Sequence, residues 1–462
     1  MKKHLISLLI VILLTSTAFM GVSYPIVSLG SGNHAPIRII GNDQFTEENG
    51  VTSGSGSEED PYIIEDWIIE NDGSASQGIF INNTDVYFII RNCIIRGFYS
   101  PEEWLRGVKF SKVTNGLIQD SNISESAIGI CLESSSFIKI INCSCSDSPT
   151  YPEGYGIHIY KSINVSISST NCFIMCYGIN ALYSHNISVR KSKCYNNIEY
   201  GLVSMEEPYL NFLIEDCNFS NNRYYGVILH GSFSSPQDSG TIIRNCSFFA
   251  NGLQGNFIAS GLEIKYLLNT IIENCSFIEN GLGIYVGEKS SDITIKNCSF
   301  IRNEKDGLQV AGAFMDLSFD PRVEISHCDF VENSCGLLFF ATHRTKVHHC
   351  NFINNSDFGV SQLFCTSCIT YNNFINNGWA SPENFTCGAF IWTSFADLRY
   401  NYWDAPEGPN FSWVIPIRKS STYKLIPIHT SENADTILLI KMGIVRYRQW
   451  LSEPVPEAGR QK

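Results

Sequence analysis

The sequence predicts an all-β protein built as a single-stranded parallel β-helix of about thirteen coils, with three short strands per coil. Two observations predict this fold. A cysteine recurs along the chain at steps of 22 to 30 residues, often directly after an asparagine, and a repeat of that length is typical of solenoids. Within each step, three short runs alternate between apolar and polar residues, as half-buried strands do.

The repeat from Asn274 to Lys296 shows the pattern clearly. A Cys-x-Phe run is followed by Gly-Ile-x-Val and then by Ile-Thr-Ile, with Asn, Gly, Ser and Asp between them as turn residues. The glycine that opens the second strand recurs from Gly78 to Gly388, and we expect it to adopt the corner conformation that other residues resist. Charges alternate in sign along the outward positions of the third strand, which predicts ion pairs between neighbouring coils: Glu215, Arg244, Glu273 and Lys296.

The seventeen cysteines would suggest a disulfide framework in an exported protein. Their regular spacing favours another interpretation. Cysteines at the same position of successive coils lie one above the other, about 4.8 Å apart, and behave as small buried apolar residues. We therefore predict that most of them are free thiols.

The chain divides into five predicted segments. Lys2 and Lys3 precede an apolar stretch and then small residues, which is typical of a secretory signal, although an uncleaved anchor is the alternative. The ends of a solenoid need caps, and the final residues are polar. The segments are a signal peptide over 1–23, an N-terminal cap over 34–74, the β-helix over 75–405, a C-terminal cap over 406–452 and a loose tail over 453–462.

Composition restricts the partners. The formal charge of -13 and the pI near 5.3 exclude nucleic-acid binding, which needs a basic surface. The hydrophobic fraction of 44% excludes a disordered chain. No second segment is long enough to span a membrane. We expect a monomer that is secreted or held at the cell surface.

The chain resembles exported right-handed β-helix proteins of the pectate-lyase-like superfamily. The resemblance is carried by the phrase from Gly54 to Trp67, by the repeated Asn-Cys-Ser-Phe with a following Gly-Ile, and by the closing Asn401-Tyr-Trp-Asp. It is nearest to the NosD-like copper-binding group, which is common among archaeal and bacterial surface proteins. The resemblance implies a right-handed coil and admits calcium or copper as cofactors, although no residue pattern requires either. It leaves the activity open, because the superfamily contains lyases, hydrolases, epimerases and non-enzymatic adhesins.

A catalytic site is one hypothesis for the outward face of the second strand, where the long insertions would form walls. Lys109, Glu133, His158 and Tyr160 fall on three consecutive coils and are candidates for acid–base chemistry or sugar binding. The alternative is a solvated sheet face of mixed polarity. Glycoside hydrolysis needs two carboxylates about 5–9.5 Å apart, whereas Glu133 and Glu263 each stand among neutral or basic neighbours.

Aromatic residues on or beside the same face are candidates for ligand binding, because their rings can stack on sugars. They are Trp104, Tyr155, Tyr285 and Trp392.

Histidines near the C-terminal end are candidates for a metal site. They are His327, His348 and His349, of which His327 and His349 occupy equivalent positions in successive coils. The alternative is that these two replace asparagine in a turn. The pair Cys365-x-x-Cys368 has no second pair at zinc-site spacing and is a weak metal motif.

The leading functional hypothesis is a non-enzymatic scaffold that binds a polysaccharide, another surface glycan or a surface protein. The alternatives are a polysaccharide-active enzyme that uses the region from Lys109 to Tyr160, and a metal-handling accessory protein.

Overall fold

A computed structural model describes most of the chain. The described residues are 32–100, 103–146, 154–207, 211–233, 237–238, 240–253, 259–287, 289–312, 322–378, 387–416, 423–429, 435–440 and 444–461. The predicted signal peptide lies outside this range. No helix among these residues is both long enough and apolar enough to cross a membrane.

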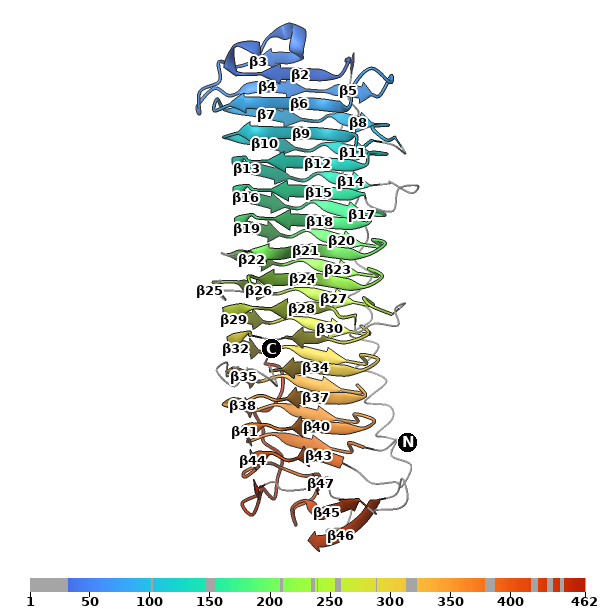
Figure 1. Ribbon diagram of the computed structural model, residues 1–462, viewed down its shortest axis with the longest axis vertical. Coiled ribbons are helices and arrows are strands. Elements are labelled where there is room, and N and C mark those ends of the chain that lie inside the picture. Colours follow the sequence, from blue (N-terminus) through green and yellow to red (C-terminus); the bar gives the residue numbers. More distant parts are fainter. Residues whose placement is uncertain are drawn as a thin grey trace.

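The chain winds into a right-handed parallel β-helix of about 12 turns. Figure 1 shows the turns stacked along one axis, with the first described strands, such as β2 (Ile37–Ile40), at one end and the hairpin of β45 (Asn410–Pro416) and β46 (Tyr423–His429) at the other. A typical turn adds one strand to each of three sheets, so the predicted fold class and the three strands per coil are confirmed.

Sheet A has 14 strands, most of them three residues long. They are β1 (Gly32–Asn33), β5 (Trp67–Glu70), β8 (Ile94–Arg96), β11 (Asn122–Ser124), β14 (Ser144–Ser146), β17 (Asn171–Phe173), β20 (Lys193–Tyr195), β23 (Asn218–Ser220), β27 (Ser247–Phe249), β30 (Ser276–Ile278), β33 (Ser299–Ile301), β36 (Asp329–Val331), β39 (Asn351–Ile353) and β42 (Asn373–Ile375).

Most strands of sheet B begin at or next to one of the recurring glycines. The strands of this sheet are β2 (Ile37–Ile40), β6 (Gln77–Thr84), β9 (Arg106–Val113), β12 (Ile128–Glu133), β15 (Tyr155–Tyr160), β18 (Tyr177–Leu182), β21 (Tyr200–Glu207), β24 (Tyr225–Gly231), β28 (Leu262–Lys265), β31 (Ile284–Val286), β34 (Asp306–Ala311), β37 (Cys335–Phe340), β40 (Phe358–Leu363), β43 (Cys387–Trp392), β47 (Thr436–Ile440) and the hairpin of β45 and β46.

Sheet C follows sheet B in each turn. Its strands are β3 (Val51–Ser53), β4 (Tyr62–Glu65), β7 (Phe88–Arg91), β10 (Gly116–Gln119), β13 (Ser136–Ile141), β16 (Ile163–Ser168), β19 (His185–Arg190), β22 (Phe212–Glu215), β25 (Gln237–Asp238), β26 (Ile242–Arg244), β29 (Leu267–Glu273), β32 (Ser291–Lys296), β35 (Val323–Ser326), β38 (Thr345–His348), β41 (Thr366–Thr370), β44 (Phe395–Asp397) and β48 (Ile444–Arg446). The N-terminal cap adds two 3-10 turns, η1 (Asn42–Gln44) and η2 (Glu47–Asn49).

The core is made of columns of identical side chains. All seventeen cysteines are free and sixteen of them are buried, in agreement with the free-thiol prediction. A column of phenylalanines stacks face to face from Phe219 to Phe374 and ends on Trp403, with neighbouring ring centroids 4.4–5.3 Å apart. Stacking of this kind buries a large apolar area.

A buried asparagine column accompanies the phenylalanines, and the sequence interpretation missed it. From Asn197 to Asn377, each amide nitrogen in the column lies 2.8–3.2 Å from the side-chain oxygen of the next turn. Asp435 accepts the last of these hydrogen bonds at 2.8 Å and ends the column. The column holds successive turns in register, because each buried amide has a partner.

The recurring glycines of sheet B do not take the positive-φ conformation that the sequence suggested. That conformation belongs instead to turn residues such as Asn274 (φ 56°) and Asn297 (φ 55°), because asparagine tolerates it. The glycines are required by close packing: a Cβ on Gly178 would lie 2.4 Å from the carbonyl oxygen of Gly201. The prediction that these glycines adopt a special corner conformation was therefore wrong.

The outward charges of sheet C pair as predicted. Glu215, Arg244, Glu273 and Lys296 stand in register on adjacent strands. Arg244 lies 2.7 Å from Glu215, and Lys296 lies 2.8 Å from Glu273.

The C-terminal tail is not loose, which corrects the prediction for 453–462. Val455 exchanges two backbone hydrogen bonds with the side chain of Asn373, at 2.7 and 3.2 Å. Farther along, the amide of Arg460 donates to Asp329 at 3.1 Å. The tail thus runs back along the outside of sheet A, held by polar side chains of several successive turns.

Candidate functional site

A hollow of about 330 Å³ opens on the outward face of sheet B, near its N-terminal end. We call it the Trp104 hollow. Residues that precede or belong to three successive strands, β9, β12 and β15, line it: Trp104, Arg106, Ile128, Cys131, Glu133, Tyr155, His158 and Tyr160. The hollow therefore collects three of the four catalytic candidates and two of the four ligand-binding candidates named from the sequence.

Strand register explains why these side chains meet. Cys131 of β12 stands between Lys109 of β9 and His158 of β15, and Glu133 stands beside Tyr160. Residues at alternate positions of a strand face the same side of the sheet, so all five point outward. The fourth catalytic candidate, Lys109, thus lies next to the hollow.

Lys109 and Glu133 form an ion pair, with 2.8 Å between Nζ and Oε2. The hydrogen bond from Lys109 is the main cause that lowers the pKa of Glu133, although partial burial opposes it. Glu133 is therefore ionised at neutral pH. A general acid for glycoside cleavage must instead be protonated.

His158 is held as a neutral imidazole. Burial lowers its pKa to about 4, and the charge of Arg106 acts in the same direction. Its Nδ1 is buried and has no hydrogen-bond partner. The ring lies between Tyr155 and Tyr160, at centroid distances of 5.0 and 6.2 Å.

A column of tyrosines leads away from the hollow along the axis of the solenoid. Tyr155, Tyr177, Tyr200 and Tyr225 are in register on β15, β18, β21 and β24. Successive ring centroids are 5.0, 5.1 and 5.6 Å apart, and Trp104 stacks on Tyr155 at 5.5 Å. We call the four residues the tyrosine column; all are half-buried.

The sequence interpretation named only Tyr155 from this column. The missed signal was local, because each of the four tyrosines directly precedes the recurring glycine of its strand. Burial raises the pKa of Tyr200 to about 12, so its hydroxyl stays neutral at neutral pH and can donate a hydrogen bond to a ligand.

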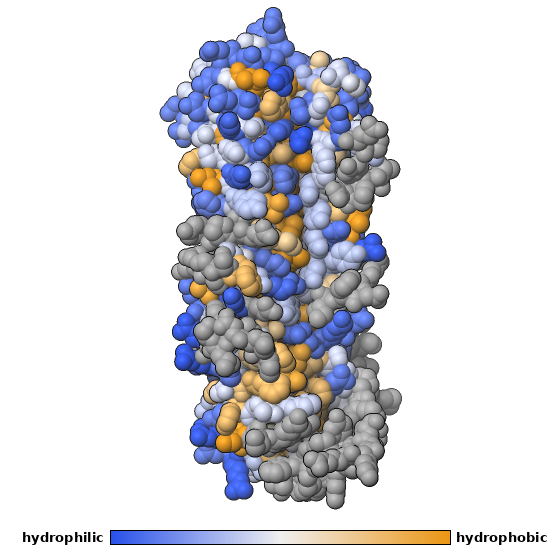
Figure 2. Space-filling view, in the orientation of Figure 1, coloured by the Kyte–Doolittle hydropathy of each residue, from blue (hydrophilic) through white to orange (hydrophobic). Residues whose placement is uncertain are grey.

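The other two ligand-binding candidates lie farther along the same face. Tyr285 is on β31, and Trp392 is on β43 beside Phe390, with ring centroids 6.4 Å apart. Half-buried apolar side chains lie on this strand and the two before it: Leu338 and Phe340 on β37, Phe358 and Leu363 on β40, and Phe390 on β43. Figure 2 shows apolar side chains gathered on the lower half of this view of the solenoid.

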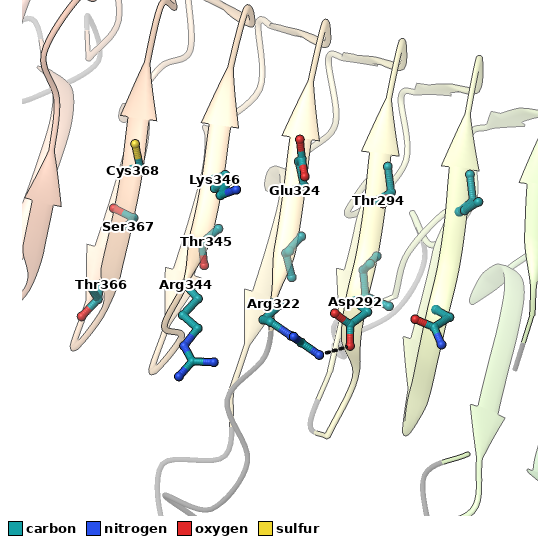
Figure 3. A pocket seen from close by; sticks show the side chains of 14 residues that line it. Asp292, Thr294, Arg322, Glu324, Arg344, Thr345, Lys346, Thr366, Ser367 and Cys368 are labelled. Atoms are coloured by element: carbon teal, nitrogen blue, oxygen red, sulfur yellow. Dashed lines mark hydrogen bonds and ion pairs between the residues drawn. The ribbon is translucent and has the colours of Figure 1, made fainter. Parts of the chain in front are cut away.

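A second hollow lies on the outward face of sheet C and is larger, about 850 Å³. Figure 3 shows its lining, in which charged and small polar side chains stand along parallel strands. Arg322 bonds Asp292 at 2.6 Å across its floor. None of its lining residues among the described part of the chain is aromatic. Its described lining therefore offers an exposed ion pair, Arg322 with Asp292, but no aromatic ring on which a ligand could stack.

Comparison with family models now places the chain. A model described as "Right handed beta helix region" matches residues 77–239 and 211–320. The chain belongs to the right-handed β-helix family. A comparison with curated protein sequences found no match. The narrower NosD-like assignment stays a prediction.

Solved structures with a similar fold come from distant β-helix proteins. A double mutant of the periplasmic alginate epimerase AlgG is 12% identical, with a TM-score of 0.46 over 74% of this chain and 84% of that one. The A-module of the Azotobacter vinelandii mannuronan C-5 epimerase AlgE4 is 11% identical, with a TM-score of 0.34 over 74% and 86%. A tailspike protein of E. coli bacteriophage HK620, solved with a pentasaccharide, is 8% identical, with a TM-score of 0.38 over 82% and 70%. At these identities the likeness concerns the fold alone.

Two of the three histidine candidates, His327 and His349, are turn residues with positive φ, whereas His348 is the last residue of β38. The rings of His327 and His349 stack at 5.1 Å with only 10° between their planes, and His349 stacks in turn on Tyr371. Nitrogen lone pairs lie in the ring plane, so stacked rings do not converge on one ion. His348 lies with its Nδ1 3.0 Å from Nδ1 of His349. No group of three metal-binding side chains suited to an ion occurs among the residues described.

The two cysteines of the Cys365-x-x-Cys368 pair lie in different environments. Cys365 is buried and Cys368 is exposed. The two carboxylates that the sequence analysis compared, Glu133 and Glu263, are also separate. Glu133 on β12 and Glu263 on β28 are five strand steps apart, or about 24 Å at the usual strand spacing. They cannot act as the two carboxylates of one glycosidase site.

Proposed function

We propose that this β-helix binds a polysaccharide chain along the outward face of sheet B, as a non-enzymatic scaffold outside the cell. The tyrosine column carries the proposal. Four rings at a regular spacing of 5.0–5.6 Å form a strip parallel to the solenoid axis. A strip of half-buried aromatic rings suits a long, repetitive ligand with alternating apolar and hydroxylated surfaces, which describes a sugar polymer.

The Trp104 hollow supplies the polar contacts at one end of this strip. Arg106 and Lys109 provide cationic donors, and Glu133 provides an ionised acceptor, within reach of the stacked pair of Trp104 and Tyr155. A small number of fixed polar groups beside an apolar surface is typical of sites that bind small molecules.

Binding is tested by affinity electrophoresis in gels that contain polygalacturonate, alginate, β-glucan or mannan. We expect retardation of the wild-type protein in at least one gel. The double variant Tyr177→Ala/Tyr200→Ala should lose about tenfold or more in affinity, which corresponds to about 1.4 kcal/mol per factor of ten. Tyr371→Ala is the matched control, because Tyr371 also belongs to an aromatic stack but lies at a turn. Absence of retardation in every gel would refute the proposal.

A polysaccharide-active enzyme is the second candidate function. The observation in its favour is the grouping of Lys109, Glu133, His158 and Tyr160 around one hollow. The protonation states favour binding instead, because an efficient base has a pKa near the working pH, whereas that of His158 is about 4. Depolymerisation or epimerisation of a uronic-acid polymer, abolished by Lys109→Ala or Glu133→Gln, would establish the enzyme.

A further inference from the structure

A second polar cluster lies on the same face of sheet B, beyond the far end of the tyrosine column. Glu263 of β28 accepts hydrogen bonds on Oε1 from His230 Nε2 at 2.8 Å and Lys265 Nζ at 2.6 Å. Only 6% of its side chain is exposed, although the residue points to the outside of the solenoid. We call Glu263, His230 and Lys265 the Glu263 cluster.

The Glu263 carboxylate fixes the positions of His230 and Lys265 by accepting a hydrogen bond from each. Burial alone would raise the pKa of Glu263, but the hydrogen bonds from His230 and Lys265 outweigh burial and lower it. An ionised carboxylate only accepts hydrogen bonds, so Nε2 of His230 carries a proton and donates it to Glu263. Tyr225, the last residue of the tyrosine column, also hydrogen-bonds to Glu263.

The surrounding chain makes room for Lys265. Its ammonium group lies 5.2 Å from the centre of the Tyr285 ring. A Cβ on Gly287 would lie 2.5 Å from Cγ of Lys265, so a glycine at this position allows the lysine to cross the face. Lys265 keeps N–H donors beyond the one that Glu263 accepts.

An exposed aromatic pair stands beside the cluster. Phe233 is 62% exposed and packs edge-on against Tyr266, with centroids 5.4 Å apart. Tyr266 in turn contacts the ring of His230 at 6.4 Å. The Glu263 cluster with Phe233 therefore combines an aromatic ring and hydrogen-bonded polar groups, as the Trp104 hollow does.

Position links the two sites. Four strand steps separate His158 on β15 from Glu263 on β28, about 19 Å at the usual spacing, and the tyrosine column fills the interval. We propose that the Glu263 cluster is a distal saccharide subsite, so that the face selects chains long enough to reach from one site to the other. The inference rests on the proposed function and adds a length requirement to it.

The test is isothermal titration with two ladders of oligosaccharides from disaccharide to octasaccharide, oligogalacturonates and cello-oligosaccharides. In the ladder that binds, wild-type affinity should rise with length and then level off. Phe233→Ser removes an exposed aromatic ring, and Lys265→Met removes a charged hydrogen-bond donor. Each should lower the affinity for the longest saccharides about tenfold. Both should leave the affinity for the shortest saccharides unchanged.

Two further variants separate the possible failures. Tyr155→Ala, in the lining of the Trp104 hollow, should weaken the binding of short and long saccharides alike. Phe233 is exposed, so its replacement leaves the fold intact even if Lys265→Met does not. Equal affinity for short and long saccharides, or equal losses for both in the Phe233 variant, would overturn the length inference and leave the proposed function standing. Absence of binding at any length in both ladders would overturn both.

Discussion

Sheets B and C both carry ion pairs on their outward faces, but the most buried carboxylate among the described pairs, that of Glu263, lies on sheet B. On sheet C, Glu273 and Lys296 are paired with 20% and 48% of their side chains exposed. On sheet B, Glu263 is paired with only 6% exposed, among tyrosines. The sheet C pairs repeat from strand to strand and support the register. The buried pair of sheet B lies beside the tyrosine column, so burial together with aromatic neighbours distinguishes the face that we propose to bind saccharide.

The largest expected effect separates the two kinds of ion pair. Glu263→Gln leaves Lys265 and His230 without a carboxylate, and removing one partner of a buried pair costs about 3–5 kcal/mol. Glu273→Gln breaks a largely solvated pair and should cost less than about 1 kcal/mol. Urea unfolding followed by circular dichroism measures both. Equal losses for the two variants would show that the faces do not differ.

The second effect concerns pH. The pKa of His158 falls from the ordinary 6.5 to about 4 on folding, mainly through burial. Between these two pH values the unfolded chain binds more protons than the folded chain. The free energy of unfolding therefore keeps its full value, as far as His158 is concerned, above pH 6.5 and decreases as the pH falls to about 4. The loss is on the order of 2–3 kcal/mol.

His158→Gln removes this titration. The free energies of unfolding of wild type and variant, measured from pH 7 to pH 4, should converge as the pH falls. A constant difference across the range would show that His158 is not buried in the neutral form.

A third effect involves sheet A, whose face the C-terminal tail covers. Gly459 has φ +91°, and a Cβ there would lie 2.3 Å from Nδ2 of Asn351 and from Oδ1 of Asp329. Gly459→Val should release the tail at a cost of about 1–3 kcal/mol, detected as faster tryptic cleavage after Arg448. Glu453→Gln, at an exposed site, is the control. Unchanged cleavage would mean that the tail does not depend on this contact, and polysaccharide binding should be unaffected in both variants.

The smallest effect is expected on sheet C. Arg244→Gln removes a cross-strand pair with Glu215 and should cost a few tenths of a kcal/mol, about 0.2–1 kcal/mol at most. Affinity for polysaccharide should not change. A clear loss of affinity would move the binding face from sheet B to sheet C.

The sequence predicted the fold because each coil repeats the same inward residues. Cysteine spacing and strand alternation are properties of neighbouring positions, and they led directly to the three-sheet solenoid. The tail could not be predicted in this way. Its contacts join Val455 to Asn373 and Arg460 to Asp329, which are distant in the sequence and follow no repeat.

The candidate site was predictable in part for the same reason. Lys109, Glu133, His158 and Tyr160 were grouped correctly because strand register brings equivalent positions of successive coils together. The Glu263 cluster was not recognised, because its partners do not all occupy equivalent positions: His230 is in register with Lys265 but reaches diagonally to Glu263. Side-chain reach of this kind depends on rotamers and burial, which a linear pattern does not contain.

Hydroxyl-radical footprinting tests the central claim most directly. The protein is oxidised with and without the polysaccharide that retards it in gels, and modification is measured for each tyrosine. We predict protection of Tyr155, Tyr177, Tyr200 and Tyr225, with no change at Tyr371 and Tyr400, which form a comparable stack at the turns. Protection of the turn stack, or unchanged modification of the tyrosine column in the presence of bound polysaccharide, would contradict the assignment of sheet B as the binding face.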